Sequence, residues 1–523
     1  MNSKIHRFVA QRWLLPLLGL LLVTPTTLAA PAREVTPTRL AAALSELDRL
    51  ATQAVNTGGV PGLSIAVVHD DKVIYLKGFG VREAGQPGAV TPDTVFQIAS
   101  MSKPMASTVV AAIVSSGAAT WDDPAIKHDS GFQLKDSWAT REVTLRDLFA
   151  HRSGLPGDAG DDLDIVGYSR DEILRRLRYV EPASSLRASY AYSNFGMTEG
   201  GVAAARAIGK TWENAAAELL YRPLGMTATS SRFEDYAATE NRALLHVGKV
   251  GAWKASFTRQ PDAQSPAGGV SSTARDLAQW MRLQLGGGML GDKRIVGADA
   301  LAETHLPHIA KGRNPATGLT AFYGLGWNVD YDEQGRVFWG HAGAFSLGAR
   351  TYVSLLPAEN LGIIVLSNAF PTGVPEALAA NFYDLALNGK LSRDWIPFWN
   401  ALYQGLYDSF GAAGAVYATP PAQPSSSLPL SAYAGTYYNE YFGNVLVAPE
   451  NGHLVLRLGP QQRPFPLRHF DRDLFTYLPD PELPAALAGV TFLVGPDRRA
   501  QSVVLGNLAD DGRGSFTRVS AHP

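Results

Sequence analysis

Ser100-Met101-Ser102-Lys103 is the stretch that decides the fold of this chain. A β-prone apolar run at residues 94–99 ends just before it, and a small, apolar run at 105–114 follows it. Ser100 is therefore expected where a helix begins, with Lys103 on the same helix face, because side chains three residues apart are neighbours on a helix. Free backbone N–H groups at a helix start stabilise negative charge.

A lysine amine beside a serine hydroxyl fits an activated serine nucleophile, which needs a neighbouring base and a site for developing negative charge. The same four residues also fit a helix N-cap followed by a solvated lysine. The Ser-x-x-Lys spacing alone does not distinguish the two interpretations. A catalytic role requires further partners elsewhere in the chain.

The 523-residue chain has an ordinary globular composition, with 46% hydrophobic and 18% charged residues, and is long enough for two or more domains. Its formal net charge is -2 and it has no run of lysine and arginine that would follow a phosphate backbone, so we expect no nucleic-acid partner. The lack of cysteine excludes disulfides, a thiolate nucleophile and a lipid-bearing cysteine. No histidine pair has the spacing of a metal site, and we expect no metal and no cofactor.

Residues 1–29 are typical of a secretory signal, with basic residues before an apolar run at 13–23 and a small-x-small cleavage site at 27–29. Residues 30–32 offer a second cleavage site. The apolar run has roughly half of the ~20 residues that a spanning helix needs, and Pro16 interrupts it. We therefore expect a secreted or periplasmic protein without a permanent membrane anchor.

Residues 35–415 are predicted to form one α+β domain. An amphipathic helix at 36–55 precedes two β-prone runs around a short polar turn, which predict a hairpin. Near the end of the region, four strands in succession predict a meander. The expected strands are 62–69 and 72–80 for the hairpin and 323–329, 337–345, 349–356 and 361–368 for the meander. We expect an antiparallel sheet built from both ends of the domain, with a helical lobe from the middle.

The middle of this region has helical patterns between polar loops. The predicted helices are 143–149, 171–180, 199–207, 211–220 and 276–285, the last with a cap from Ser272 or Thr273. His151 lies where the first of these helices meets a glycine- and proline-rich loop. A histidine there could be catalytic, but we interpret it as a residue that holds the loop backbone in place.

Two further regions follow the α+β domain. An aromatic-rich helix is predicted at 390–410, and we interpret its aromatic stripe as core or an interdomain face. Residues 416–430 form a linker by their proline and serine content. Residues 431–523 are predicted to be a small all-β, barrel-like domain. Its expected strands are 435–438, 444–447, 453–458, 474–478, 490–494 and 502–505.

Three motifs occur in order along the chain: Ser100-Met101-Ser102-Lys103, Tyr192-Ser193-Asn194 and His341-Ala342-Gly343. Together they resemble the signature elements of the serine β-lactamase and penicillin-binding protein superfamily. The likeness is closest to the class C-like branch, which includes DD-peptidases, D-aminopeptidases and esterases, because the second element is Tyr-x-Asn. It covers roughly residues 40–390, and the tail from about 430 resembles the small β-barrel-like appendage of some members.

The resemblance implies roles for the residues of the first two motifs. Ser100 would attack a carbonyl carbon and carry the acyl group. Lys103, when neutral, would accept the serine proton, and Tyr192, acidified by nearby positive charge, would pass a proton to the leaving group. Which of Lys103 and Tyr192 is the acylation base stays open. Asn194 would bind Lys103 or the substrate amide.

The third motif carries the remaining implied roles. The backbone N–H groups of Ser100 and Ala344 would form the oxyanion hole, and Gly343 would let the substrate approach the strand closely. His341 departs from the resemblance, since β-lactamases and many DD-peptidases have a lysine there that binds the substrate carboxylate. Histidine is only fractionally charged near neutral pH, which weakens the case for efficient β-lactam hydrolysis. A packing role for His341 is the alternative.

The sequence thus predicts a secreted serine hydrolase that acts through an acyl-enzyme. Its partner would be a small ester, an amide or a D-residue-containing peptide, with peptidoglycan-derived substrates included. A class C-like β-lactamase or DD-carboxypeptidase is one alternative. A penicillin- or peptidoglycan-binding protein that is acylated without turnover is another, because no residue is identified that would activate the deacylating water.

Overall fold

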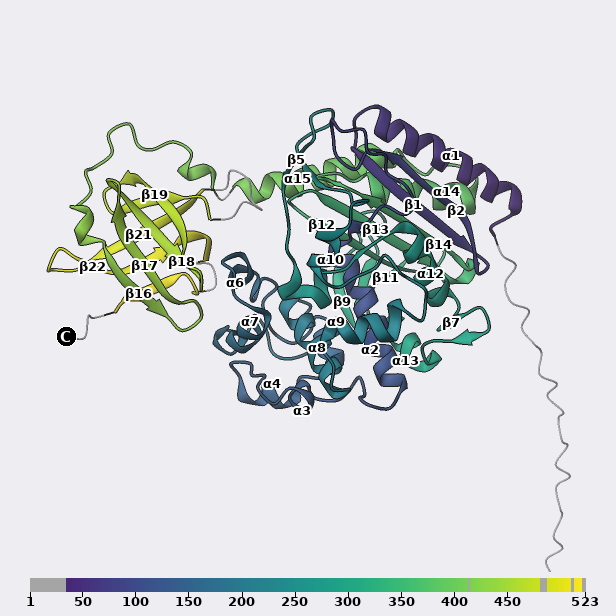
Figure 1. The fold of residues 1–523 in the computed structure, drawn as a ribbon, viewed down its shortest axis with the longest axis horizontal. Coiled ribbons are helices and arrows are strands. Elements are labelled where there is room, and N and C mark those ends of the chain that lie inside the picture. The colour runs from purple at the N-terminus through teal and green to yellow at the C-terminus, as the bar shows by residue number, and fades with distance from the viewer. Residues whose placement is uncertain (1–33, 413, 480–486, 509–511, 520–523) are drawn as a thin grey trace, which may run out of the picture.

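A computed structural model describes residues 34–412, 414–479, 487–508 and 512–519. The predicted signal at 1–29 and its cleavage sites lie outside the described residues. Within the ranges given above, no helix is both long enough and apolar enough to cross a membrane. A mixed α and β domain is followed by a separate barrel, drawn in yellow-green at the left of Figure 1.

The first domain is organised around an eight-stranded antiparallel sheet, which confirms the predicted α+β fold. In spatial order its strands are β2 (Lys72–Gly80), β1 (Gly62–His69), β14 (Leu361–Ser367), β13 (Ala349–Leu356), β12 (Val337–Phe345), β11 (Asn328–Tyr331), β10 (Thr320–Tyr323) and β9 (Ile309–Arg313). Because β1 lies beside β14, the sheet is built from both ends of the domain, as predicted. The tight turn of the first hairpin places Asp70 and Asp71 at φ of 48° and 60°.

One predicted strand of the meander is wrong. Residues 323–329 are not a continuous strand, because Tyr323 ends β10 and Asn328 begins β11. The link between them bends at Gly326, which has a φ of 80° and passes the helix that follows Ser100 so closely that an added Cβ would lie 2.7 Å from the carbonyl oxygen of Lys103. The link thereby packs against the residues of the first motif.

β1 is buried along almost its whole length, and its side chains alternate between two cores on opposite faces of the sheet. Leu63, Ile65 and Val67 pack with α1 (Pro37–Asn56) and α14 (Val374–Asn388). Ala66 and Val68 face the opposite core, where α12 (Ala274–Leu285) contacts β1 and β14. A slip of one residue would exchange the two faces, so burial of these side chains fixes the register.

The other helices of the middle region form the lobe beside the sheet. They are α2 (Ser102–Ser115), α3 (Ala125–His128), α4 (Ser137–Glu142), α5 (Leu145–Phe149), α6 (Asp161–Ile165), α7 (Arg170–Arg176), α8 (Asn194–Ala207), α9 (Trp212–Ala216), α10 (Phe233–Ala238), α11 (Ser265–Gly268) and α13 (Ala298–Ala302). The five predicted helices are present with shifted ends. The largest shift is in α8, which begins at Asn194 rather than at residue 199, and Thr273 caps α12 by accepting a hydrogen bond from Asp276 N (3.1 Å).

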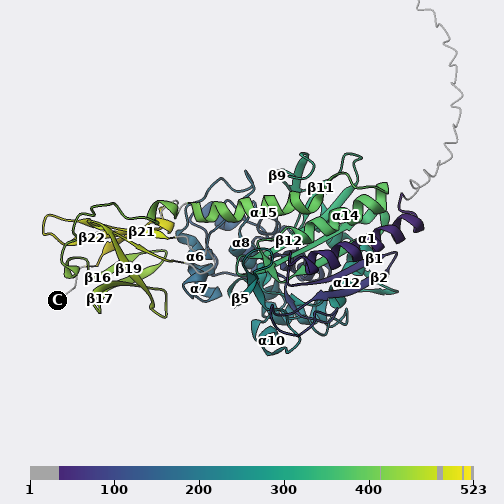
Figure 2. The same cartoon turned by 90° about the horizontal axis from the view of Figure 1, so that it is seen from above.

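The aromatic-rich helix is α15 (Trp395–Ala412), which runs from the sheet domain towards the barrel (Figure 2). It packs against α14, a helix that the sequence analysis does not predict. Arg350 of β13 forms a buried ion pair with Glu376 of α14, and the Arg350 guanidinium lies 3.7 Å from the centre of the Tyr403 ring. Trp395 of the stripe is buried and Tyr403 is half-buried against Arg350, whereas Leu402 and Leu406 are exposed, so the core interpretation holds for part of the stripe.

The C-terminal domain is a closed eight-stranded barrel in which β16 pairs with β23. Its strands are β16 (Gly435–Asn439), β17 (Gly443–Glu450), β18 (His453–Leu458), β19 (Arg463–Asp471), β20 (Leu474–Tyr477), β21 (Ala488–Val494), β22 (Ala500–Leu505) and β23 (Ser515–Arg518). The six predicted strands are confirmed. Two strands are not predicted from the sequence: β19, whose Pro464 and Pro466 are atypical of a strand, and the short β23.

Candidate active site

Ser100 lies in a 3₁₀ turn, Ala99–Met101, that leads directly into α2. Ala99 has a φ of 49°, a left-handed conformation that costs a non-glycine residue roughly 1–2 kcal/mol. Ser102 holds the turn, since its Oγ donates to Ala99 O (2.6 Å) and accepts from Val270 N (2.9 Å). Ser100 is partly exposed while its neighbours are buried, so the predicted nucleophile at a helix start is accessible.

Lys103 lies beside Ser100, as the spacing predicts, and it is fully buried. Its Nζ donates to Ser100 Oγ (3.2 Å), to Asn194 Oδ1 (2.7 Å) and to Ala267 O (3.0 Å). Burial lowers the pKa of Lys103 from 10.5 to about 7, against the opposing effect of the Asp161 carboxylate. A large fraction of the amine is therefore neutral at neutral pH and able to accept a proton.

Tyr192 completes the group around the serine. Its ring centre lies 4.4 Å from Lys103 Nζ, and its hydroxyl is close enough to the Ser100 side chain for Ser100 to lower the pKa of the phenol. The expected acidification of this phenol is not found, because burial raises the pKa of Tyr192 more than the Ser100 side chain lowers it. The phenol thus carries its proton in the resting protein and is placed to donate it.

Asn194 is the first residue of α8, and the local sequence places it there. Ser193 caps the helix by accepting a hydrogen bond from Gly196 N (3.1 Å), so the helix starts at the residue next to the cap. Asn194 Oδ1 accepts from Lys103, and its Nδ2 donates to both carboxylate oxygens of Asp161 at 3.2 Å. The predicted contact with Lys103 is confirmed.

His151 holds the loop that carries Tyr192. It adopts a φ of 55°, its Nδ1 accepts from Ser193 N (3.1 Å), and its carbonyl oxygen accepts from Ala191 N (2.9 Å). Burial and the positive charge of Lys103 keep the pKa of His151 well below its ordinary value. The interpretation of His151 as a residue that positions backbone is confirmed.

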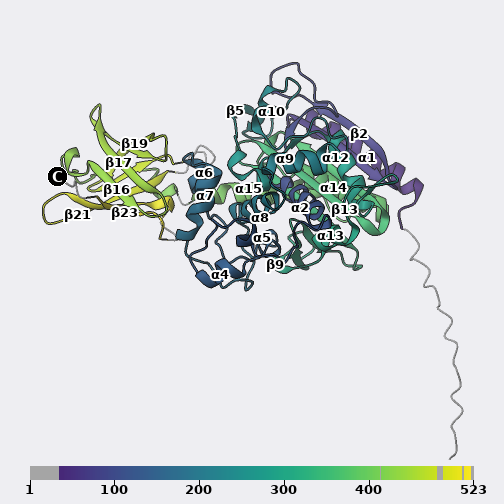
Figure 3. The same cartoon turned by 60° about the horizontal axis from the view of Figure 1, so that its bottom comes forward.

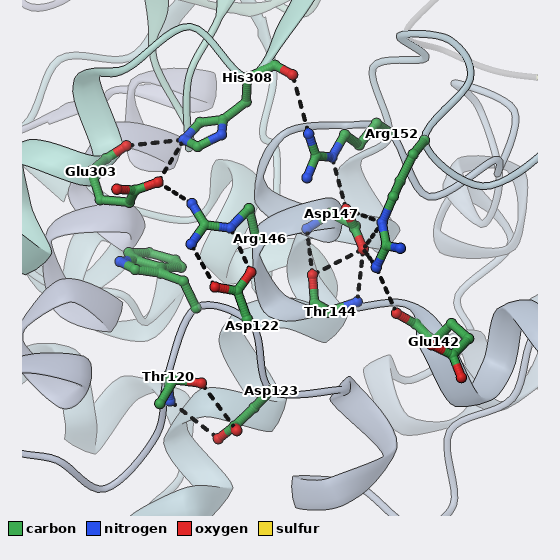
Figure 4. A network of polar contacts seen from close by, with 12 residues as sticks. Thr120, Asp122, Asp123, Glu142, Thr144, Arg146, Asp147, Arg152, Glu303 and His308 are labelled. Carbon is green, nitrogen blue, oxygen red and sulfur yellow. Dashed lines mark hydrogen bonds and ion pairs between the residues drawn. The ribbon is translucent and has the colours of Figure 1, made fainter. Parts of the chain in front are cut away.

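An ion-pair network holds the segment on either side of His151 (Figure 4). Asp147 forms a capping box with Thr144 at the start of α5 and accepts from Arg152 Nε (2.7 Å) and Arg187 Nη2 (2.9 Å). Burial alone would raise the pKa of Asp147, but the hydrogen bonds from these three residues outweigh it and lower the pKa. Arg152 also donates to His308 O (3.1 Å), which connects the loop to the segment before β9.

The third motif lies on β12, which packs against the 3₁₀ turn of Ser100. A Cβ at Gly343 would lie 2.1 Å from Ile98 O and 3.0 Å from Met101 N. The close approach of the protein's own backbone therefore requires glycine here, and the predicted approach of a substrate stays a prediction. It places Ala344, the next residue and the second predicted oxyanion donor, beside the nucleophile's turn.

His341 is 4% exposed, and both of its ring nitrogens have partners. Nε2 lies 3.0 Å from Tyr323 Oη and Nδ1 lies 2.7 Å from Ala342 O, which assigns the proton to Nδ1. Burial above all, and then the charge of Lys103, lower the pKa of His341 well below its ordinary value. The imidazole is therefore neutral, and the partial charge that the sequence analysis expects near neutral pH is absent.

Sequence reasoning misses two groups of residues at the site. Tyr190 and Tyr323 surround His151 in an aromatic cluster, with ring centres 5.9 Å and 4.9 Å from the histidine. Asp161, the first residue of α6, contacts Asn194, and burial raises its pKa to about 7. The sole signal for Asp161 in the sequence is the run of acidic residues at 158–164.

The barrel borders the lobe near this site. A cavity of about 740 Å³ lies between barrel residues Gln461 and Arg463 and the segment from Asp164 to Arg170. Leu347, in the turn after β12, lines the same cavity. In the described part of the chain, no group of three or more histidine, aspartate or glutamate residues could hold a metal ion.

This geometry supports acyl transfer. An accessible serine, a buried amine with a pKa of about 7 and a protonated phenol meet at one point. Acyl transfer needs a nucleophile, a base and an acid, and these three side chains have the chemistry for those roles.

Comparisons with known proteins agree with this arrangement. The family model described as Beta-lactamase matches residues 47–388, and a domain of unknown function, DUF3471, matches residues 419–514. Unguisins hydrolase ungD' of Aspergillus campestris is 25% identical and covers 76% of each chain. Penicillin-binding protein 4 of Amycolatopsis lactamdurans is 27% identical over 73% of this chain and 94% of its own.

Solved structures show the same fold. The octameric penicillin-binding protein homologue from Pyrococcus abyssi superposes with a TM-score of 0.57 at 21% identity, over 91% of this chain and 100% of that one. SurE superposes with a TM-score of 0.55 at 19% identity, over 92% of this chain and 100% of its own. Since the Beta-lactamase family model spans more than half of the sequence, this chain belongs to the β-lactamase family, whose members are generally serine hydrolases.

Proposed function

We propose that this protein is an exported serine hydrolase that cleaves a small ester, an amide or a D-residue-containing peptide through an acyl-enzyme. The observation that carries the proposal is the position of Lys103 Nζ, 3.2 Å from Ser100 Oγ with a pKa lowered to about 7. A lysine with its ordinary pKa would be protonated at neutral pH and unable to take the serine proton.

The reaction begins when Ser100 Oγ attacks the carbonyl carbon and Lys103 accepts the hydroxyl proton. The new C–O bond pushes the carbonyl electrons onto oxygen, which the N–H groups of Ser100 and Ala344 stabilise. Tyr192 gives its proton to the leaving oxygen or nitrogen as that bond breaks, and the Lys103 ammonium returns a proton to Tyr192. Water then attacks the acyl-enzyme and releases the acid.

The state of His341 supports an ester or a D-residue peptide over a β-lactam. A neutral, doubly hydrogen-bonded imidazole lacks the permanent charge with which a lysine attracts a carboxylate. The name of one relative, an unguisins hydrolase, supports hydrolysis, and the structure of SurE with D-Leu, at a TM-score of 0.53 and 19% identity to this chain, supports a substrate with a D-residue.

Acylation without turnover is a second candidate, which the similarity to penicillin-binding protein 4 over 94% of that protein supports. A substrate panel of p-nitrophenyl butyrate, D-amino acid amides and nitrocefin separates the two. The proposal expects continuous release of nitrophenol, and a single stoichiometric burst overturns it in favour of the binding protein. Ser100→Ala is the control and should abolish both labelling by a fluorophosphonate and release of product.

Export is proposed from the pattern of residues 1–29. N-terminal sequencing of the protein recovered from the periplasm or medium should begin at residue 30 or 33. Recovery of the unprocessed chain from the cytoplasm alone would overturn this part of the proposal.

A further inference from the structure

The barrel holds the short helix α6 by contacts with its first turn. Figure 3 shows α6 and α7 on the side of the lobe that faces the barrel. Tyr441, in the turn between β16 and β17, accepts a hydrogen bond from Gly160 N (2.9 Å) and donates one to Asp162 Oδ1 (2.6 Å). Arg513 pairs with Asp158 and, at 3.3 Å, with Asp162. Tyr441 and Arg513 are 3% and 8% exposed and the Asp162 side chain is 13% exposed, so the contacts with Asp162 are largely shielded from water, whereas the Asp158 side chain is 58% exposed.

Asp161 lies between Gly160 and Asp162, the two residues that Tyr441 contacts. Its side chain points away from the barrel, into the active site. Asp161 receives both hydrogen bonds of the Asn194 amide nitrogen, and the oxygen of the same amide binds Lys103 Nζ. Gly160, just before Asp161, has a φ of 92°, and a Cβ there would lie 2.7 Å from the Phe195 ring. The backbone at Asp161 is thereby held from the barrel side and from the α8 side.

We propose that Asp161 is a positioning residue for the Lys103 base, and that the barrel fixes it through the hydrogen bonds of Tyr441 to Gly160 and Asp162. This inference rests on the proposed function and gives the barrel a role in catalysis. Asp161 orients the Asn194 amide so that its oxygen faces Lys103 Nζ. Its carboxylate also sets how readily Lys103 loses a proton.

The sign of the electrostatic effect follows from the groups around Asp161. Lys103 is the nearby cation, Asn194 donates two hydrogen bonds, and Asp162 and Asp164 are nearby anions that oppose ionisation of Asp161. An ionised Asp161 raises the pKa of Lys103, while burial of the amine lowers it. Removing the carboxylate charge therefore leaves burial unopposed and lowers the pKa of Lys103 further.

The first test is Asp161→Asn, which keeps the size of the side chain and an acceptor for Asn194. The rate of fluorophosphonate labelling of Ser100 is measured against pH. It should fall at acidic pH (the acid limb), and the midpoint of this fall should lie about one pH unit lower than in the wild type. Asp171→Asn makes the same chemical change on α7, where the side chain is 82% exposed, and should leave the limb in place. An Asp161→Asn profile that coincides with the wild type overturns the inference.

The second test removes the contact from the barrel. Tyr441→Phe abolishes both hydrogen bonds to α6 and should reduce kcat about tenfold with little change in KM. Tyr438→Phe is the control, since Tyr438 is 46% exposed on the neighbouring strand. In a protein that already carries Asp161→Asn, adding Tyr441→Phe should not change the pH profile further, because both substitutions act through α6.

Additive effects of Tyr441→Phe and Asp161→Asn on the pH profile would refute the role of the barrel. If Tyr441→Phe does not fold, the pH profile of Asp161→Asn still tests the role of Asp161. The labelling assay also separates this inference from the proposed function. Absence of labelling in the wild type contradicts the proposed function, whereas labelling with an unmoved acid limb contradicts only the role of Asp161.

Discussion

Gly343→Ala should disable the protein while leaving it folded, because the added methyl group collides with the backbone that carries the nucleophile. The new Cβ would lie 2.1 Å from Ile98 O, whereas ordinary contact begins at 3.4 Å. Ile98 O has little freedom to move away, since it accepts from Met101 N (3.2 Å) and from Thr351 Oγ1 (2.8 Å). The strand must therefore separate from the turn of Ser100 by about 1.3 Å.

A separation of this size moves Ala344 away from the developing oxyanion. A misplacement of about 1 Å costs roughly 10²-fold in rate, and loss of one oxyanion donor costs about 10² to 10³-fold. We expect kcat to fall at least ~10²-fold. The overlap should also destabilise the fold by about 1–3 kcal/mol.

The measurement compares hydrolysis of p-nitrophenyl butyrate with thermal unfolding followed by circular dichroism. Gly340→Ala is the matched control on the same strand, since its Cβ would meet Val353 O at 3.0 Å and nothing else closer than 3.6 Å. The control should retain most of its activity. A folded Gly343→Ala protein with kcat within threefold of the wild type would show that β12 does not supply the oxyanion donor.

Four further outcomes are expected. Because burial lowers the pKa of Lys103, kcat/KM should rise with pH up to about 7 and level off as the amine becomes neutral; a profile flat from pH 5 to 9 would exclude it as the base. Tyr192→Phe should slow amide hydrolysis far more than that of p-nitrophenyl esters, whose leaving group needs no proton, and equal losses would contradict its role as the acid. With His341 neutral, KM for acidic substrates should not change between pH 6 and 8, and a steep rise would show an imidazolium. Glu376→Gln should cost about 3–5 kcal/mol in urea unfolding, since it leaves the buried Arg350 guanidinium without its anion; a loss under 1 kcal/mol would mean that the pair is dispensable.

Local patterns of apolar residues predict most of the helices and strands, because each pattern can be recognised within one short segment. β1 is a short β-prone run that is buried on both faces, and the apolar stripe of α1 repeats at helical spacing, so both are found without knowledge of the fold. The failure at β19 has the same origin. Proline is atypical of strands, but Pro464 and Pro466 lie on the exposed face of β19 while Phe465 and Leu467 point into the barrel.

The residues of the three motifs can be predicted because each motif is contiguous, whereas their supports come from distant parts of the chain. Asp161 lies 33 residues before Asn194, and no period relates the two. Tyr323 ends a strand and reaches His341 only because β10 and β11 turn back beside β12. The charge state of His341 depends on burial, which the motif does not reveal, and for that reason the expectation of a partly charged imidazole is wrong.

The pairing of β1 with β14 has a consequence for the order of folding. Leu63 pairs with Ser367, so the contacts that close the sheet join residues about 300 apart, and contacts of such long range form late. A growing chain that has passed residue 115 already contains the Ser100–Lys103 helix, but it has neither β12 beside the serine nor β14 to complete the sheet. The nascent chain therefore contains Ser100, the proposed nucleophile, before it contains Ala344, the proposed oxyanion donor. We expect Ser100 to become reactive only when the domain is nearly complete.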